Sequence, residues 1–92
     1  MQERQVTICN KLGLHVRAAT LFVQMANSFD VELTIAHQEQ TADAKSIMEV
    51  LMLAATLGSE VVLTAEGDSP EEEAEALDSL VGLIENKFNE GE

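Results

Sequence analysis

A histidine and an arginine two residues apart mark the place where this sequence could do chemistry. They are His15 and Arg17, in the stretch NKLGLHVRAAT, and the chain has only two histidines and five basic residues in all. His15 stands where a turn leads into a predicted helix. A helix N-terminus has unpaired backbone N–H groups and a partial positive charge, which together bind anions. The same positive charge disfavours a protonated imidazole, and a neutral imidazole is a nucleophile.

Phosphoryl transfer is the chemistry that suits this arrangement. A phosphoryl group on His15 would meet the backbone amides of Val16 and Arg17, and the guanidinium of Arg17 adds two parallel N–H donors that fit a phosphate. Stabilising the charge of the transferred group is the main contribution that a protein makes to such a reaction. The sequence has no GxxxxGK[ST] nucleotide signature. A lone acceptor histidine without a nucleotide site suggests a carrier that receives phosphate from another protein.

Plainer interpretations stay open for His15, because a histidine at this place can also be a helix cap or an ordinary surface residue. Other potential sites are weaker. We expect Cys9 to be a partly buried, unreactive thiol, since no basic neighbour activates it, and His37 to be solvated on a polar turn. The acidic run 71–73 falls in the first turn of a predicted helix, where the dipole favours negative charge. We therefore predict no metal site.

The hydrophobic pattern predicts seven elements in the order β-α-β-β-α-β-α. Alternation predicts strands at residues 6–8, 31–36 and 60–64, and a short edge strand follows a polar turn at residues 40–43. Apolar residues at helical spacing predict helices over residues 16–27, after Ser46 and after Ser69. Each helix has one apolar stripe and each strand one apolar face. The economical packing is an α+β fold with all helices on one side of a four-stranded antiparallel sheet.

Two capping boxes mark where the later helices begin. Ser46 is followed by Glu49, and Ser69 by Glu72, the S-x-x-E pattern, with Pro70 at the first helical position. The predicted buried stripes are Ala19, Phe22, Val23 and Ala26 in the first helix, Ile47, Val50, Leu51 and Ala54 in the second, and Leu77, Leu80, Val81, Ile84 and Phe88 in the third.

Length and charge narrow the function further. The 92 residues suit a single domain spanning 1–92, and the net charge of −12 argues against nucleic acid and against an anionic membrane surface. Ten of the 17 acidic residues lie in residues 66–92, whereas the stretch between Arg4 and Asp30 holds Lys11, His15 and Arg17 without an acid. A small cationic spot on an acidic protein suits a small anion.

The remaining composition points to the cytoplasm. No apolar run approaches the roughly 18 residues of a membrane helix, and the polar start MQERQVTIC is unlike a signal peptide. A single cysteine cannot form an internal disulfide, which fits a reducing compartment. We expect a cytoplasmic protein that needs no cofactor.

Two motifs resemble those of a known family. GLHVRAAT is similar to the Gly-Leu-His-Ala-Arg-Pro-Ala signature of HPr, the histidine-containing phosphocarrier of the bacterial phosphoenolpyruvate-dependent phosphotransferase system. KSIMEVLML resembles the second motif of that family, around its regulatory serine. The similarity extends from Val6 to about Phe88. It implies the fold of the family, an open-faced sandwich of four antiparallel strands and three helices, which agrees with the order predicted above.

The resemblance also implies a role for each site residue. Enzyme I would phosphorylate His15 on Nδ1 with phosphate from phosphoenolpyruvate, the group would pass to a histidine of an EIIA domain, and Arg17 would contact it. Ser46 would receive a regulatory phosphate from HPr kinase/phosphorylase, where that enzyme is present. Ile47 and Met48 would form the apolar part of the docking surface. A core position competes for Ile47, whereas Met48 lies off the buried stripe and methionine suits a surface with several partners. The chain would then be a monomeric carrier rather than an independent catalyst.

The sequence departs from the family pattern at several positions. Ala18 stands where the family usually has proline, Val16 replaces a small residue, and Gln24, Asn27 and Glu49 occupy positions where many relatives carry lysine. These changes affect the transfer step and the choice of partner more than the fold. They allow a carrier of a nitrogen-type branch as well as one for sugar uptake. The alternative from another class is a regulatory module that docks through the same apolar residues without transferring phosphate.

Overall fold

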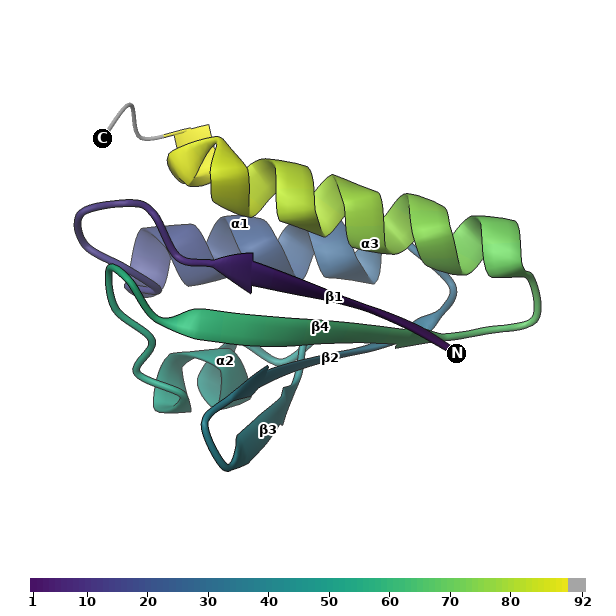
Figure 1. The fold of residues 1–92 in the computed structure, drawn as a ribbon, viewed down its shortest axis with the longest axis horizontal. Helices are drawn as coiled ribbons and strands as arrows, with labels where there is room; N and C mark the ends of the chain where they lie inside the picture. The colour runs from purple at the N-terminus through teal and green to yellow at the C-terminus, as the bar shows by residue number, and fades with distance from the viewer. Residues whose placement is uncertain (90–92) are drawn as a thin grey trace.

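The structure, a computed structural model that describes residues 1–89, has the predicted elements in the predicted order (Figure 1). They are β1 (Gln2–Thr7), α1 (Val16–Asn27), β2 (Glu32–His37), β3 (Gln40–Asp43), α2 (Ile47–Met52), β4 (Glu60–Glu66) and α3 (Pro70–Glu85), with the 3₁₀ helix η1 (Lys87–Asn89) after α3. The bounds of α1 and β3 agree with the prediction. Strand β1 begins four residues earlier than predicted, because its polar first half pairs with β4 without any hydrophobic alternation.

The sheet is antiparallel throughout, with the strand order β1-β4-β2-β3. Every second side chain of β4 is buried, namely Val61, Leu63 and Ala65. Helix α1 packs against both α2 and α3, and the three helices lie on one side of the sheet (Figure 1). This is the open-faced α+β sandwich that the sequence predicted.

An aliphatic core fills the space between the sheet and the helices. The predicted stripes are buried at Ala19, Phe22 and Ala26 of α1 and at Leu77, Leu80 and Ile84 of α3. Phe88, just beyond α3, is also buried, with a backbone φ of 53°. Val23 and Val81 lie at the margin of the core and are only partly buried.

Helix α2 is shorter than the sequence predicted. It ends at Met52, and Leu53, not Ala54, is the buried residue at its C-terminal end. Ala54 is exposed and has a φ of 53°, in the left-handed region where the chain turns out of the helix. The prediction for Ala54 was wrong because apolar spacing does not show where a short helix stops.

His37 is not the solvated turn residue that the sequence predicted. It ends β2, is half-buried, and its ring Nδ1 lies 3.0 Å from the carbonyl oxygen of Leu53. The side chain of His37 therefore ties the end of β2 to the end of α2.

Both predicted capping serines are confirmed, but the capping box at Ser46 is incomplete. The backbone N–H groups of Glu49 and Glu72 donate to the hydroxyls of Ser46 and Ser69, each at 3.4 Å. The carboxylate of Glu49 does not return to the N–H of Ser46. It accepts a hydrogen bond of 3.0 Å from the N–H of Asp43, at the end of β3.

Glu73 lies in the first turn of α3, as predicted, but the sequence did not indicate that its side chain is buried. It is only 4% exposed. Its carboxylate accepts hydrogen bonds from the N–H of Gly67 at 2.8 Å and from the side-chain amide of Gln2 at 3.3 Å. The hydrogen bond from the Gly67 backbone is the main cause that lowers the pKa of Glu73, and the amide of Gln2 acts in the same direction. Glu73 thus joins β1, the loop after β4 and α3.

This geometry predicts a stability that depends on pH. A carboxyl group whose pKa is lowered by folding stabilises the protein above its unfolded pKa, and this contribution is lost as the pH falls through the folded pKa. We expect Glu73→Gln to have a lower free energy of unfolding than the parent at pH 7, and the difference to shrink as the pH falls below 4.5, the ordinary value for this group. Urea unfolding between pH 3 and pH 7 measures this. Glu71→Gln, an exposed neighbour on α3, is the matched control, and equal pH profiles for the two variants would contradict the role of Glu73.

Candidate functional site

The loop between β1 and α1 is held in place by hydrogen bonds within the loop and to the segment after α2. The side-chain amide of the buried Asn10 donates to the carbonyl oxygen of Gly13 at 2.8 Å, and the N–H of Gly13 donates to the carbonyl oxygen of Asn10 at 3.2 Å. The N–H of Leu14 donates to the carbonyl oxygen of Ala55, in the segment after α2, at 3.0 Å. The residue that follows, His15, is therefore delivered to the start of α1 by a loop with a defined course.

Gly13 is the residue that allows this course, and the sequence showed only that it belonged to a turn. Its φ is +68°, in the region that favours glycine. A Cβ atom at this position would lie 2.6 Å from the carbonyl oxygen of Ala55 and 2.8 Å from the Cα atom of Thr56. The close approach of the two backbones depends on the lack of a side chain, and this requirement is a tertiary contact that no local pattern shows.

His15 occupies the N-cap position of α1. Its backbone is extended, with φ −82° and ψ −180°, and its carbonyl oxygen accepts the first helical hydrogen bond, from Ala19 at 2.8 Å. Its side chain forms no capping hydrogen bond, so the imidazole does not have the capping role that the sequence left open. The imidazole is partly exposed at the end of the helix where backbone N–H groups point outward.

The first turn of α1 presents the groups that the sequence indicated. Val16 is 64% exposed and Arg17 is exposed, and the first turn contains no acidic residue. The backbone N–H groups of this turn have no acceptor within the helix. Ala18 is fully buried, and α1 begins at Val16 without the proline of the family pattern. Alanine thus keeps the helix, as expected.

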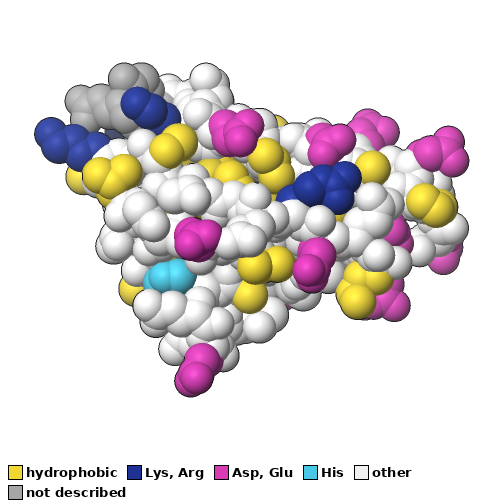
Figure 2. Space-filling view, in the orientation of Figure 1, with side chains coloured by type: hydrophobic (Ala, Val, Ile, Leu, Met, Phe, Trp, Pro, Cys, Tyr) yellow, Lys and Arg dark blue, Asp and Glu magenta, His cyan; other side chains and the backbone are white. Residues whose placement is uncertain are grey.

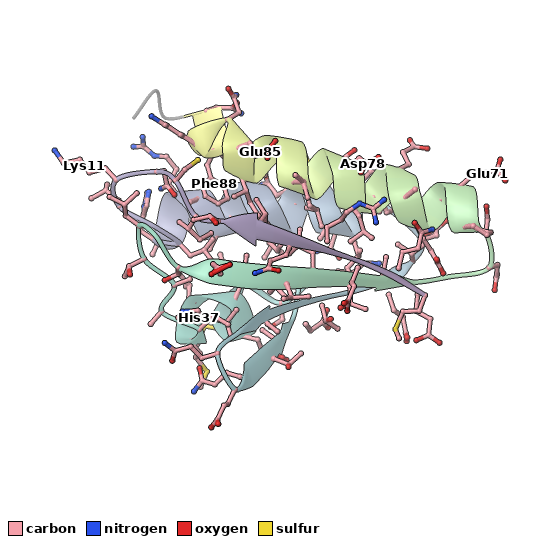
Figure 3. All side chains as sticks on the ribbon, viewed as in Figure 1. Lys11, His37, Glu71, Asp78, Glu85 and Phe88 are labelled. Carbon is pink, nitrogen blue, oxygen red and sulfur yellow. The ribbon has the colours of Figure 1, made fainter. Side chains whose placement is uncertain are left out.

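Basic side chains gather at this end of the molecule. Figure 2 shows Lys and Arg together at the end where the β1–α1 loop lies, and acidic groups along α3 and at the opposite end. Figure 3 labels Lys11 in this loop, with Phe88 nearby and Glu71 at the far end of α3. Helix η1 brings Lys87 to the same end as the start of α1 (Figure 1). Lys87 lies far from Arg17 in the sequence, so the sequence did not indicate that it adds to the cationic spot.

The thiol of Cys9 lies just before this loop and is partly buried, as predicted. Its Sγ lies 3.2 Å from the carbonyl oxygen of Ile84, near the end of α3. Among residues 1–89, no group of three or more His, Cys, Asp or Glu side chains is placed to hold a metal ion. Within the same residues, no helix is both long and apolar enough to cross a membrane.

Ser46 is separated from His15 by the length of α1. The side-chain amide of Asn27, the last residue of α1, donates to the carbonyl oxygen of Lys45 at 3.2 Å, whereas Leu14 contacts Ala55 at the other end. Helices α1 and α2 therefore run antiparallel. The 12 residues of α1 span about 18 Å at 1.5 Å per residue. Ser46 caps α2 beside the end of α1 that is distant from His15.

The outer side of α2 carries exposed apolar side chains beside the exposed Glu49. Met48 is 68% exposed, while Ile47 is partly buried against the core. Met52, one turn further on, is 73% exposed, and Leu12 and Leu57 are exposed in the loops next to α1 and α2. Met52 was not among the predicted docking residues, although its spacing of four residues from Met48 places both on the same side of the helix. Met48 and Met52 together form the α2 face.

Comparison with known proteins assigns the chain to a family. The protein family described as "PTS HPr component phosphorylation site" matches residues 2–86. The chain belongs to the HPr family. It is 49% identical to the phosphocarrier protein HPr of Cupriavidus necator over 92 residues, the full length of both chains. It is 46% identical over 88 residues to the phosphocarrier protein NPr of Shewanella violacea. The aligned residues are 96% of this chain and 93% of that protein.

Solved structures agree with the assignment to HPr. The crystal structure of an HPr protein from Thermoanaerobacter tengcongensis superimposes with a TM-score of 0.91 at 44% identity, covering 98% of each chain. The HPr resemblance inferred from the two sequence motifs is thereby confirmed, and a general role as a phosphocarrier follows from it.

Proposed function

We propose that the chain is a single-domain, monomeric, cytoplasmic phosphocarrier that accepts a phosphoryl group on His15 from Enzyme I, which draws it from phosphoenolpyruvate. The phosphorylated chain passes the group to a histidine of an EIIA domain. It carries the group between two enzymes and is not an independent catalyst. The observation that carries the proposal is the placement of the His15 imidazole at the N-terminus of α1, in a cationic end of an acidic protein.

The transfer step uses groups of the first turn of α1. The Nδ1 atom of His15 attacks phosphorus while the bond to the histidine of Enzyme I breaks, so one phosphoryl group moves between two imidazoles. Hydrogen bonds to the phosphoryl oxygens come from the backbone N–H groups of Val16 and Arg17 and from the guanidinium of Arg17. These bonds stabilise the negative charge of the oxygens. The reaction needs no nucleotide and no metal on this chain.

Docking on Enzyme I and on EIIA involves the α2 face together with Ile47. Exposed methionines adapt to different apolar surfaces because the side chain is unbranched and flexible. The side of α2 that bears Met48 also carries Glu49 instead of a basic residue. Apolar contact therefore contributes more to this docking than attraction to an acidic partner does.

Ser46 is a candidate for regulatory phosphorylation by HPr kinase/phosphorylase. Its hydroxyl caps α2 and is partly exposed. A phosphate there is a dianion at a helix N-terminus, which is electrostatically acceptable. A phosphate on Ser46 would lie beside the docking residues of α2 and far from His15. It would therefore affect docking rather than the His15 imidazole.

A carrier of the nitrogen-type branch is the second candidate, favoured by the similarity to the Shewanella violacea protein named NPr. A regulatory module that docks without transfer remains the alternative from another class. Incubation with phosphoenolpyruvate and Enzyme I of the sugar-type or nitrogen-type system separates these functions. A gain of one acid-labile phosphoryl group, measured by intact mass spectrometry, supports the carrier, and the faster Enzyme I identifies the branch. No gain with either enzyme would leave the docking module.

Arg17 provides a separate test of the transfer step. We expect Arg17→Ala to slow phosphoryl transfer by about 10²-fold, because the loss of one preorganised donor to a developing anion has an effect of this order. The fold should persist, since Arg17 is exposed. Quench-flow phosphorylation by Enzyme I measures the rate of phosphoryl transfer, and far-UV circular dichroism shows whether the fold persists.

Lys11→Ala is the matched control for Arg17→Ala, because it removes the same charge from the same end of the molecule (Figure 3). It should slow transfer only a few-fold and mainly at low salt, as expected for a contribution to long-range attraction. Equal losses in the two variants would show that Arg17 contributes net charge alone and makes no directed contact.

A further inference from the structure

The α2 face places two thioether sulfurs in solvent on one side of a short helix. Met48 and Met52 are 68% and 73% exposed, and their spacing of four residues puts them one above the other. Met52 also lines a hollow of about 330 Å³ that lies between α2 and β3, beside Gln40 and Glu49. A small neutral solute can therefore reach both sulfur atoms without any movement of the fold.

The other two methionines of the chain differ from this pair in one respect each. Met25 is partly buried and packs against the core. Met1 is 79% exposed, but it lies at the other end of the molecule, where its amino group is 3.5 Å from the carboxylate of Glu73. Exposure and location on the docking surface coincide only at Met48 and Met52, since the sequence contains four methionines.

We propose that Met48 and Met52 form an oxidation-sensitive site through which hydrogen peroxide weakens the interaction of the chain with Enzyme I. The inference rests on the proposed function. In the step, a sulfur lone pair attacks one oxygen of the peroxide, the O–O bond breaks, an S–O bond forms, and water leaves after proton transfer. Sulfur loses two electrons and the peroxide gains them, so thioether and peroxide become sulfoxide and water.

The product changes the surface that docks. A sulfoxide is polar and accepts hydrogen bonds, whereas the thioether is apolar and polarizable. An apolar partner surface would have to dehydrate two S=O groups without giving them hydrogen-bond donors, and this opposes docking. His15 and Arg17 belong to α1 and its cap and are not altered, so oxidation should raise KM for the carrier rather than lower kcat.

The test treats only the carrier with hydrogen peroxide, removes the peroxide with catalase, and then measures transfer from phosphoenolpyruvate through Enzyme I. We expect peptide mass spectrometry to find sulfoxide at Met48 and Met52 before Met25, and the KM for the carrier to rise roughly tenfold at full oxidation of the pair. Methionine sulfoxide reductases A and B together should restore the original KM. Circular dichroism should stay unchanged.

Two variants assign the effect to the pair. Met48→Leu/Met52→Leu keeps an apolar surface that peroxide cannot oxidise, so its KM, whatever its starting value, should not change on treatment even though Met1 and Cys9 are still present. Met25→Leu should remain as sensitive as the parent. An unchanged KM in the parent with both sulfoxides formed, resistance of Met48 and Met52 to oxidation, or equal sensitivity of the double variant would each overturn the inference. Failure of the untreated chain to accept phosphate would instead refute the proposed function.

Discussion

A chain carrying His15→Ala should take up no phosphoryl group from phosphoenolpyruvate and Enzyme I. The transfer needs a nucleophile at the N-terminus of α1, and alanine supplies none, so the rate should fall by at least about 10³-fold. The other histidine of the sequence, His37, lies at the end of β2 with its Nδ1 atom 3.0 Å from the carbonyl oxygen of Leu53. Intact mass spectrometry and ³¹P NMR of the treated protein measure the outcome.

His37→Ala is the matched control, because it removes the same side chain from a different place. It should accept phosphate at the rate of the parent. Its free energy of unfolding should fall by about 1 kcal/mol, since one hydrogen bond between β2 and the end of α2 is lost. An acid-labile phosphoryl group on His15→Ala, or its absence from His37→Ala, would show that the acceptor is assigned to the wrong imidazole.

Replacing Gly13 with alanine should damage both stability and transfer. The new Cβ atom would lie 2.6 Å from the carbonyl oxygen of Ala55, and the backbone would have to keep a φ of +68°. We expect a loss of about 3 kcal/mol in the free energy of unfolding, from the steric overlap and the backbone strain together. If the loop relieves the overlap by moving away from Ala55, His15 is displaced, and a shift of about 1 Å can slow a reaction by about 10²-fold. Urea unfolding and phosphorylation kinetics measure the two effects.

Gly58→Ala separates strain from steric overlap. Gly58 also has a positive φ, of +91°, but a Cβ atom there would meet nothing within 4 Å. It should therefore cost only about 1 kcal/mol, from the backbone conformation, and leave transfer unchanged. A similar loss of stability in both variants, with normal transfer in Gly13→Ala, would mean that the contact with Ala55 does not position His15.

Local patterns determined the element order and several of the helix ends. The bounds of α1 were predictable because its apolar residues repeat at helical spacing directly after a turn. Ser46 and Ser69 cap their helices as predicted, since a hydroxyl accepts a hydrogen bond from an N–H only three residues away. The position of His15 at a helix N-terminus follows from the same short-range information.

Long-range contacts decided what the local patterns could not show. His37 was predicted to be solvated because polar neighbours surround it in the sequence, and the burial of Glu73 was not predicted. Glu73 is buried because Gly67 and Gln2 offer it N–H donors, and His37 because the end of α2 lies against the end of β2. The partners of Glu73 and His37 come from other elements, so no periodicity in the chain records them.

The candidate site also depends partly on local sequence and partly on long-range contacts. The sequence alone predicted which imidazole and which guanidinium would handle a phosphoryl group, because both lie within one turn of a helix start. Only the tertiary structure decided that Ala55 holds the loop before His15, that Lys87 joins the cationic end, and that Ser46 lies at the far end of α1. Side-chain chemistry and helical spacing are local properties, whereas the approach of two segments depends on how the sheet and helices pack around a common core.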